Sequence, residues 1–366
     1  MFASCAHAPA RDGAELYARA ATLAQAGDRD GAIATLEQLP ACWDLPPTAR
    51  DFAALAGDAR FTSIATTLAR REPQVHHATT AFTFHAPALI PEGIAWDPAT
   101  GRLFAGSLYR REIVVVTPGG EARTFVGRDA GLDAVVGIRV DPEHHLLWAT
   151  SDGLATMVDA TPGDLGRAGV MSFDLETGAV QSKIALVEPG AHGLNDLVVH
   201  RGELYATDTD GGQVWRVANG RFVLVVAKLS NPNGIASDGE HVFVSDDTAI
   251  HVIDGDHTTP LPHPACSPTG GVDGLYYDRD ALYAVQNGIG APRVVRMQLD
   301  AAHRAITRVD VLETANPAFH TPTTGALDVV GHRLLVLADS WIGTFDPKAH
   351  VPPPHDDVTI LAIPLP

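Results

Sequence analysis

A motif of two short apolar runs recurs six times in the sequence, and it constrains the fold more than any other feature. In each copy a first residue, often followed by Gly, leads into a few apolar residues, a turn and a second apolar run. The first copy covers residues 92–107 and the second covers residues 136–151. The copies begin at residues 92, 136, 195, 233, 273 and 324. Such self-similarity indicates a repeat architecture in which each copy is one structural unit.

The spacing of the copies predicts a β-propeller. The steps between them are 44, 59, 38, 40 and 51 residues, and a four-stranded propeller blade needs ~40–50 residues. We interpret residues 152–167, within the longest step, as an inserted loop. Two more strand-like runs follow the first copy, at 112–117 and 121–126. We therefore expect an all-β, six-bladed propeller over residues 78–366, since seven or eight blades do not fit this length. A β-sandwich is the alternative.

The residues before this repeat show a helical pattern instead. Apolar residues recur at helix spacing from Leu16 to Leu39, with a break at Gly27-Asp28, and this pair resembles one tetratricopeptide-type hairpin. A second pair follows, in which Asp58 caps a helix that runs to about Arg70. One hairpin leaves its apolar face uncovered, so we expect residues 1–77 to pack on the propeller as a cap. A peptide-binding role would require more repeats.

Composition excludes several classes of partner. The formal net charge is −18, which disfavours nucleic acids and anionic membrane surfaces because both are recognised by basic groups. No apolar stretch approaches the ~20 residues of a membrane span. A small-molecule substrate is therefore the expected partner, and the sequence gives no indication of the oligomeric state.

The cysteines and the first ten residues bear on the cellular compartment in which the protein works. Cys5, Cys42 and Cys266 are odd in number and have no metal-like spacing, so we expect neither a disulfide framework nor a zinc site. Residues 2–5 resemble the end of a bacterial lipoprotein signal and residues 6–8 an A-x-A cleavage site, although Met1 leaves no room for an apolar region. We expect residues 1–10 to be a signal remnant of a protein exported to the periplasm or cell envelope. The alternative is a cytoplasmic protein with a disordered end.

The first residue of each copy carries the candidate chemistry. Ring geometry places all six around the central channel, at one mouth. They are Glu92, Val136, Asn195, Asn233, Asp273 and Thr324. Four of them are Glu, Asn, Asn and Asp. All four offer oxygen and none offers sulfur or imidazole, which suits calcium, or another hard divalent ion, better than zinc or copper. Asn-Gly and Asp-Gly pairs are also ordinary turn signals, so turns are the alternative interpretation.

These segments resemble a known superfamily. The sequence P-E-G-I-A-W-D, followed in order by N-D-L, P-N-G-I-A and D-G-L, is similar to the senescence-marker-protein/gluconolactonase family, and also to the paraoxonases and diisopropylfluorophosphatase. The resemblance implies a six-bladed propeller with a central calcium and hydrolysis of lactones, esters or phosphotriesters. It implies Glu92, Asn195, Asn233 and Asp273 as calcium ligands. It also implies Asp273 as nucleophile or general base.

Gly193 departs from this pattern, because sugar-lactone members commonly carry Arg two residues before the matching Asn. This favours a less polar substrate. His192 and His320 precede first residues and are candidate proton shuttles. Other candidates follow second strands, where they line the mouth or cap turns; they are Tyr109, Asp208, Asp246, Asn287, Asp339 and Trp341.

We therefore expect a calcium-dependent lactonase or esterase in which the metal polarises the scissile carbonyl. Asp273 and His192 are the catalytic candidates, and Tyr109, Asp208, Asn287, His320 and Trp341 the substrate-binding ones. The alternatives are a non-catalytic binding propeller with a structural calcium, or a condensing enzyme similar to strictosidine synthase.

Overall fold

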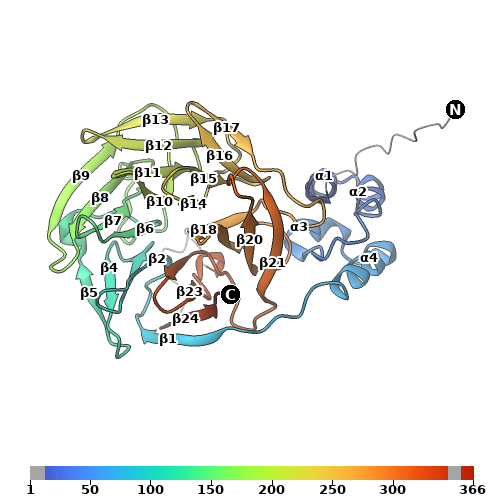
Figure 1. Cartoon of the computed structure of the whole chain (residues 1–366), viewed down its shortest axis with the longest axis horizontal. Helices are drawn as coiled ribbons and strands as arrows, with labels where there is room; N and C mark the ends of the chain where they lie inside the picture. The colour runs from blue at the N-terminus through green and yellow to red at the C-terminus, as the bar shows by residue number, and fades with distance from the viewer. Residues whose placement is uncertain (1–12, 345–355) are drawn as a thin grey trace.

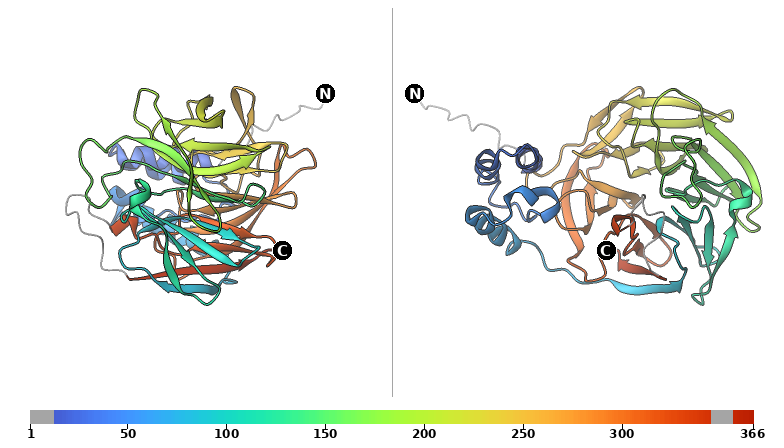
Figure 2. Two further views of the ribbon diagram at one scale, coloured as in Figure 1. Left: turned by 90° about the vertical axis from the view of Figure 1, so that its left-hand side faces the viewer. Right: turned by 180° about the vertical axis from the view of Figure 1, so that it is seen from behind.

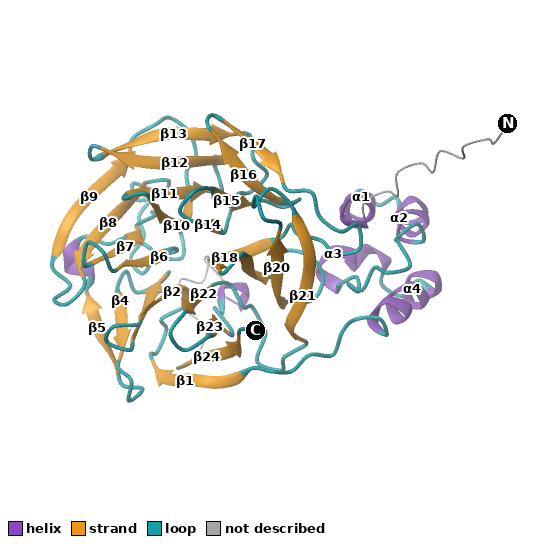
Figure 3. Ribbon diagram, in the orientation of Figure 1, coloured by secondary structure: helices purple, strands orange, loops and turns teal. Residues whose placement is uncertain are grey.

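A computed structural model describes residues 13–344 and 356–366 of the chain. The described strands form six four-stranded antiparallel sheets arranged as a ring, so the six-bladed propeller is confirmed and the sandwich is excluded (Figure 1). Alternating and β-branched apolar residues between Gly- and Asp-rich turns give each sheet two faces that pack on its neighbours. Strands are orange and helices purple in Figure 3, where α1, α2, α3 and α4 lie together beside the ring of strands.

Five blades are built from consecutive strands. They are β2 (Pro91–Asp97), β3 (Arg102–Ser107), β4 (Ile113–Val116) and β5 (Ala122–Val126); β6 (Ile138–Asp141), β7 (Leu146–Thr150), β8 (Ala168–Asp174) and β9 (Val180–Leu186); β10 (Leu194–His200), β11 (Glu203–Asp208), β12 (Gln213–Ala218) and β13 (Arg221–Ala227); β14 (Ile235–Ser237), β15 (Val242–Ser245), β16 (Ile250–Asp254) and β17 (His257–Pro260); and β18 (Val272–Asp278), β19 (Ala281–Gln286), β20 (Arg293–Leu299) and β21 (Ile306–Thr314).

The sixth blade joins the two ends of the propeller. It contains β22 (Gly325–Asp328), β23 (Arg333–Leu337) and β24 (Asp357–Pro364), and its outer strand is β1 (Thr79–His85) from before the first repeat. β1 pairs antiparallel with β24. The ring is therefore closed by backbone hydrogen bonds between segments far apart in the sequence, a pairing that the repeat pattern does not contain.

The hydrophobic core lies between neighbouring blades. Each of six apolar clusters draws its side chains from two adjacent sheets. One of them packs Phe84 and Ile360 of the sixth blade against Leu103 of the first. Every sheet thus buries both faces, and the inner strands β2, β6, β10, β14, β18 and β22 surround the middle of the ring.

The α-helices lie beside the propeller. They are α1 (Gly13–Gln25), α2 (Arg29–Leu36), α3 (Ala49–Phe52) and α4 (Ala59–Ala69), and the short 3₁₀ turns are η1 (Ala53–Leu55), η2 (Arg128–Ala130) and η3 (Ile342–Thr344). Asp58 caps α4 as predicted, since its side chain accepts a hydrogen bond from the Arg60 backbone N–H at 2.9 Å. The group lies next to the blade of β20 and β21, and the side and rear views in Figure 2 agree.

The helical segment has a core of its own that extends onto the propeller. Tyr17, Trp43 and Phe52 are fully buried, and they share one apolar cluster with Ile289 of the propeller. Arg50 donates a 2.6 Å hydrogen bond to the Asn287 carbonyl. The segment is therefore docked, as expected for a cap. Its likeness to a tetratricopeptide repeat and its division from residues 78–366 as a separate domain stay predictions.

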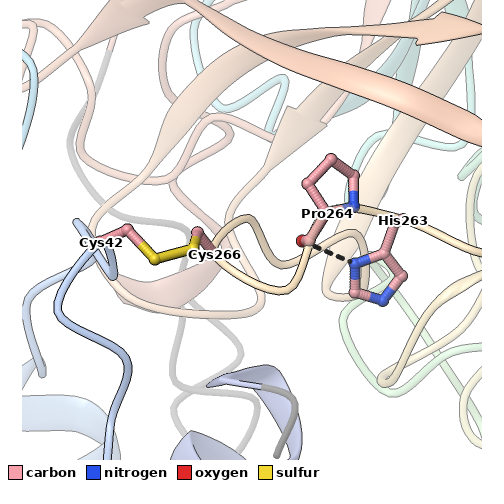
Figure 4. The surroundings of a disulfide bond; sticks show 4 residues. All are labelled: Cys42, His263, Pro264 and Cys266. Carbon is pink, nitrogen blue, oxygen red and sulfur yellow. Dashed lines mark hydrogen bonds between the residues drawn. A yellow bond between two sulfur atoms is a disulfide. The ribbon is translucent and has the colours of Figure 1, made fainter. Parts of the chain in front are cut away.

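A disulfide bond corrects the interpretation of the cysteines. Cys42, just before α3, is bonded to Cys266 in the loop between β17 and β18, with a Cα–Cα distance of 5.5 Å (Figure 4). The partners are 224 residues apart in sequence, so only docking of the helical segment brings them together. Their spacing alone gives no sign of this. Cys5 and residues 1–10 lie outside the described residues.

Among the described helices, none is long and apolar enough to cross a membrane. This agrees with the hydropathy of the sequence.

We predict that Cys42→Ser/Cys266→Ser lowers the free energy of unfolding by about 2–5 kcal/mol, because the crosslink restricts the unfolded chain over a long loop. Urea unfolding under non-reducing conditions measures this change. Cys5→Ser is the control and should leave the unfolding midpoint unchanged. A double variant as stable as the parent protein would contradict the prediction.

Candidate metal centre

The first residues of the six repeats meet around the channel because the inner strands approach one another very closely. A Cβ atom on Gly93 would lie 2.2 Å from the Val136 carbonyl oxygen, and one on Gly137 would lie 2.0 Å from that of Asn195. Only glycine fits such contacts with a neighbouring backbone.

The remaining neighbours complete the ring. A Cβ on Gly234 would lie 2.6 Å from the Asp273 carbonyl oxygen, and one on Gly274 would lie 3.1 Å from the Thr324 Cα. The Thr324 hydroxyl donates to the Glu92 carbonyl at 2.6 Å. Between the third and fourth repeats, the Ile235 backbone N–H donates to Asp196 Oδ2 at 3.2 Å. The order of contacts around the channel is thus the order of the repeats.

These contacts settle the alternative interpretation of the Asn-Gly and Asp-Gly pairs. Primed hairpin turns require a glycine with φ in the left-handed range. The φ angle lies outside that range at Gly93, Gly137, Gly234 and Gly274. Asp273 lies within strand β18, and Asn233 lies directly before Gly234 and β14. The glycines are needed for close approach of the blades, and the residue before each, which is polar except for Val136, is thereby held at the channel.

Each of the four predicted oxygen ligands has a buried oxygen atom without a hydrogen-bond partner. These atoms are Glu92 Oε2, Asn195 Oδ1, Asn233 Oδ1 and Asp273 Oδ1. Buried polar atoms are rarely left unpaired, because each unpaired group costs roughly 1–3 kcal/mol. Four unpaired oxygen atoms, each on the first residue of a repeat, are what a set of cation ligands would show in the absence of the cation. A hard divalent ion would satisfy all four.

The same residues concentrate negative charge in a buried place. Burial raises the pKa of Glu92 well above its usual range, and the nearby Asp273 and Asp196 carboxylates raise it further. Burial also raises the pKa of Asp273 to about 7, although the Asn287 and Asn233 amides stabilise the carboxylate. A bound cation would offset this repulsion.

Asn287 holds Asp273 in place. Its amide nitrogen donates to Asp273 Oδ2 at 2.5 Å and to the Pro322 carbonyl at 2.7 Å. The predicted mouth-lining residue is therefore in direct contact with a predicted ligand. Asn195 is fixed in a similar way, because its amide donates to the Thr209 hydroxyl at 3.2 Å.

Beneath this ring lies a second polar layer that the sequence analysis did not single out. Asp196 accepts from the Arg139 guanidinium at 3.0 Å and from the Ile235 backbone N–H at 3.2 Å. The Arg139 guanidinium also lies 5.4 Å from the centre of the Tyr276 ring. Asp196 occupies the position at which all five other repeats have glycine, and this departure from the repeat is the sequence signal that could have identified it.

His192 and Asp208 lie together, but as a fully bonded pair. His192 Nδ1 is 2.6 Å from Asp208 Oδ2, and its Nε2 is 3.2 Å from the Glu188 carbonyl oxygen. Asp208 also accepts from the Trp215 indole and from the backbone N–H groups of Gly193 and Gly211. Asp208 is completely buried, so this geometry anchors the loop before Asn195 and leaves no carboxylate oxygen for a substrate.

The other candidates are more dispersed. His320 Nδ1 lies 2.9 Å from Asp339 Oδ2, and the His320 and Trp341 rings are 5.6 Å apart. Tyr109 packs instead with the Ile90 cluster and accepts a hydrogen bond from Val158 of the inserted loop at its carbonyl.

Asp246 closes a turn. Its carboxylate accepts from the Thr248 backbone and hydroxyl.

The sequence matches none of the protein-family models and none of the curated proteins with which it was compared. Comparison with solved structures shows the fold. An aldose sugar dehydrogenase from Streptomyces coelicolor, in its PQQ-bound form, superposes with a TM-score of 0.55 at 16% identity, covering 78% of this chain and 98% of that one. A gluconolactonase from Xanthomonas campestris superposes with a TM-score of 0.52 at 19% identity, covering 79% of this chain and 89% of that one. The calcium-binding protein regucalcin from Agrobacterium tumefaciens superposes with a TM-score of 0.50 at 21% identity, covering 78% of this chain and 97% of that one.

We predict that Gly137→Ala lowers the free energy of unfolding by at least ~1–3 kcal/mol, the usual cost of overpacking, because the new methyl group meets the Asn195 backbone. Gly119→Ala is the matched control, since the nearest atom to its Cβ would be 3.7 Å away. Urea denaturation of both variants measures the difference. Equal midpoints would argue against the close approach of the blades.

Proposed function

We propose that the protein is a calcium-dependent hydrolase of lactones or esters, acting at the mouth of the propeller channel. The observation that carries the proposal is the set of four buried, unpaired oxygen atoms on Glu92, Asn195, Asn233 and Asp273. Two carboxylates and two amides match the charge and the preference of a hard divalent ion. Zinc and copper are less suited, because these four residues offer neither imidazole nor thiolate.

Calcium, when bound, supplies a Lewis acid that polarises a carbonyl oxygen and stabilises negative charge. The chain's own residues would orient the reaction. The Asn287 amide fixes Oδ2 of Asp273, and Oδ1 is the oxygen that would bind the ion. Asp273 would thus be held next to both the ion and a substrate bound to it, as a general base or nucleophile requires.

The substrate that we propose is less polar than an aldonolactone. Gly193 stands where sugar-lactone enzymes commonly carry Arg, so this position supplies no guanidinium to bind the hydroxyl groups of a sugar. Small aliphatic lactones and aryl esters are therefore the first compounds to test.

The disulfide bond bears on the compartment. Disulfides persist in oxidising environments and are rare in the cytosol of mesophiles. Together with the signal-like residues at the start of the sequence, the Cys42–Cys266 bond supports a protein that works in the periplasm or at the cell envelope.

We predict that calcium raises the melting temperature. At 100 times its dissociation constant, a ligand that binds only the native state adds about 2.7 kcal/mol to its stability. Thermal melts with excess calcium and with excess chelator measure the shift, and elemental analysis gives the stoichiometry. Identical melts, with no calcium in the protein, would refute the metal centre.

We predict that Asp273→Asn lowers turnover by ~10²–10⁴, the usual contribution of general acid–base catalysis, while the protein still folds and takes up calcium. Asn195→Asp retains the oxygen ligand and is the companion variant, so it should reduce activity less. Hydrolysis of an aryl ester and an aliphatic lactone, measured alongside calcium content, separates the two.

Parent-like turnover by Asp273→Asn would exclude its chemical role. A parent protein that binds calcium but hydrolyses no lactone, ester or phosphotriester would favour a non-catalytic propeller with a structural calcium.

A further inference from the structure

A second cluster of metal-ligating side chains lies on the opposite face of the propeller. It consists of Asp238 in the turn from β14 to β15, His241 at the end of that turn, and His303 in the turn from β20 to β21. The inner strands start at the calcium mouth, so the turn that ends β14 is at the other end of the ring. One potential ligand atom from each residue lies within 4.8 Å of the others.

We propose that Asp238, His241 and His303 bind one divalent transition-metal ion of the zinc class, which ties the fourth blade to the fifth. The donor set is two imidazole nitrogens and one carboxylate oxygen, which is typical of zinc and unlike the all-oxygen set in the channel. Since no cysteine takes part, cysteine spacing gives no indication of it.

The carboxylate is preorganised for such an ion. Asp238 Oδ1 accepts hydrogen bonds from the backbone N–H groups of Glu240 at 2.7 Å and His241 at 2.5 Å. These bonds leave Oδ2 directed at the two imidazoles, with His241 Nδ1 at 2.9 Å and His303 Nδ1 at 2.6 Å. Only 1% of the Asp238 side chain is exposed. Both nitrogens thus converge on one buried oxygen.

The spacing of the three ligand atoms also fits a zinc ion. A tetrahedral zinc ion with bonds of ~2.0–2.2 Å holds its ligand atoms roughly 3.3 Å apart. The two contacts to Asp238 Oδ2, at 2.9 and 2.6 Å, need to lengthen by less than about 1 Å to match this spacing. The imidazoles remain partly exposed, at 21% for His241 and 17% for His303, so an ion has an entry path and a fourth position open to water.

Asp280 completes the arrangement from the turn between β18 and β19. Its Oδ1 lies 3.2 Å from His303 Nε2, the ring nitrogen that faces away from Asp238. Metal-binding histidines commonly donate their other ring N–H to a carboxylate, which fixes the tautomer and strengthens the ligand. Asp280 therefore has the place of an outer partner. A doubly protonated His303 would also satisfy both carboxylates, so the experiment distinguishes an ion from a proton.

The test is a zinc titration of metal-depleted full-length protein, with calcium kept in excess to occupy any oxygen-ligand site. We expect one zinc ion per chain, and at least ~10–100-fold weaker binding by His303→Gln, since loss of even an outer partner costs that much. His257→Gln is the matched control, because His257 also contacts an aspartate, at 3.3 Å from Asp256, but is 69% exposed and outside the cluster.

A second measurement uses the unaltered protein. One equivalent of zinc should shift the imidazole NMR signals of two histidines. A parent protein that takes up no zinc, a His303→Gln variant that binds it as tightly as the parent, or unshifted imidazole signals would each overturn the proposal and leave a proton-held ion-pair cluster.

Discussion

Burial of both faces of every sheet is the constraint on which the rest of the structure depends. A single four-stranded sheet with two apolar faces is stable only between two neighbours, and six such sheets satisfy this condition by forming a ring. The clusters between blades, such as Phe84 and Ile360 against Leu103, supply the apolar contact. The pairing of β1 with β24 completes the sixth blade and so closes the ring.

The candidate metal centre follows from the same packing. As the inner strands converge, no space is left for a side chain after the first residue of most repeats, as Gly137 against the Asn195 backbone illustrates. The first residue itself is then forced to the channel. Where that residue is Glu, Asn or Asp, its oxygen is buried without a protein donor. Propeller closure and ligand placement therefore have one physical cause.

The sequence was sufficient for the features that repeat and insufficient for those that occur once. The six copies of the repeat predicted the six blades. The shared position of Asn233 and Asp273 at the start of their repeats predicted that both lie at the same mouth of the channel. The closing strand β1, the Cys42–Cys266 bond and the layer of Arg139 and Asp196 depend on docking between distant segments, which no local pattern records. Asp208 was expected to line the mouth or cap a turn, and its full set of donors appears only in three dimensions.

The pairing of β1 with β24 also has a consequence for the time course of folding. His85 and Asp357, which are partners in this pairing, are 272 residues apart. At ribosomal rates of ~5–20 residues per second, the second strand is completed roughly 14–54 s after the first. During this interval β1 lacks its partner, and an unpaired strand edge is a site at which another chain can pair. The last strand to be synthesised thus decides when the ring closes, and with it how long the nascent protein stays exposed to aggregation.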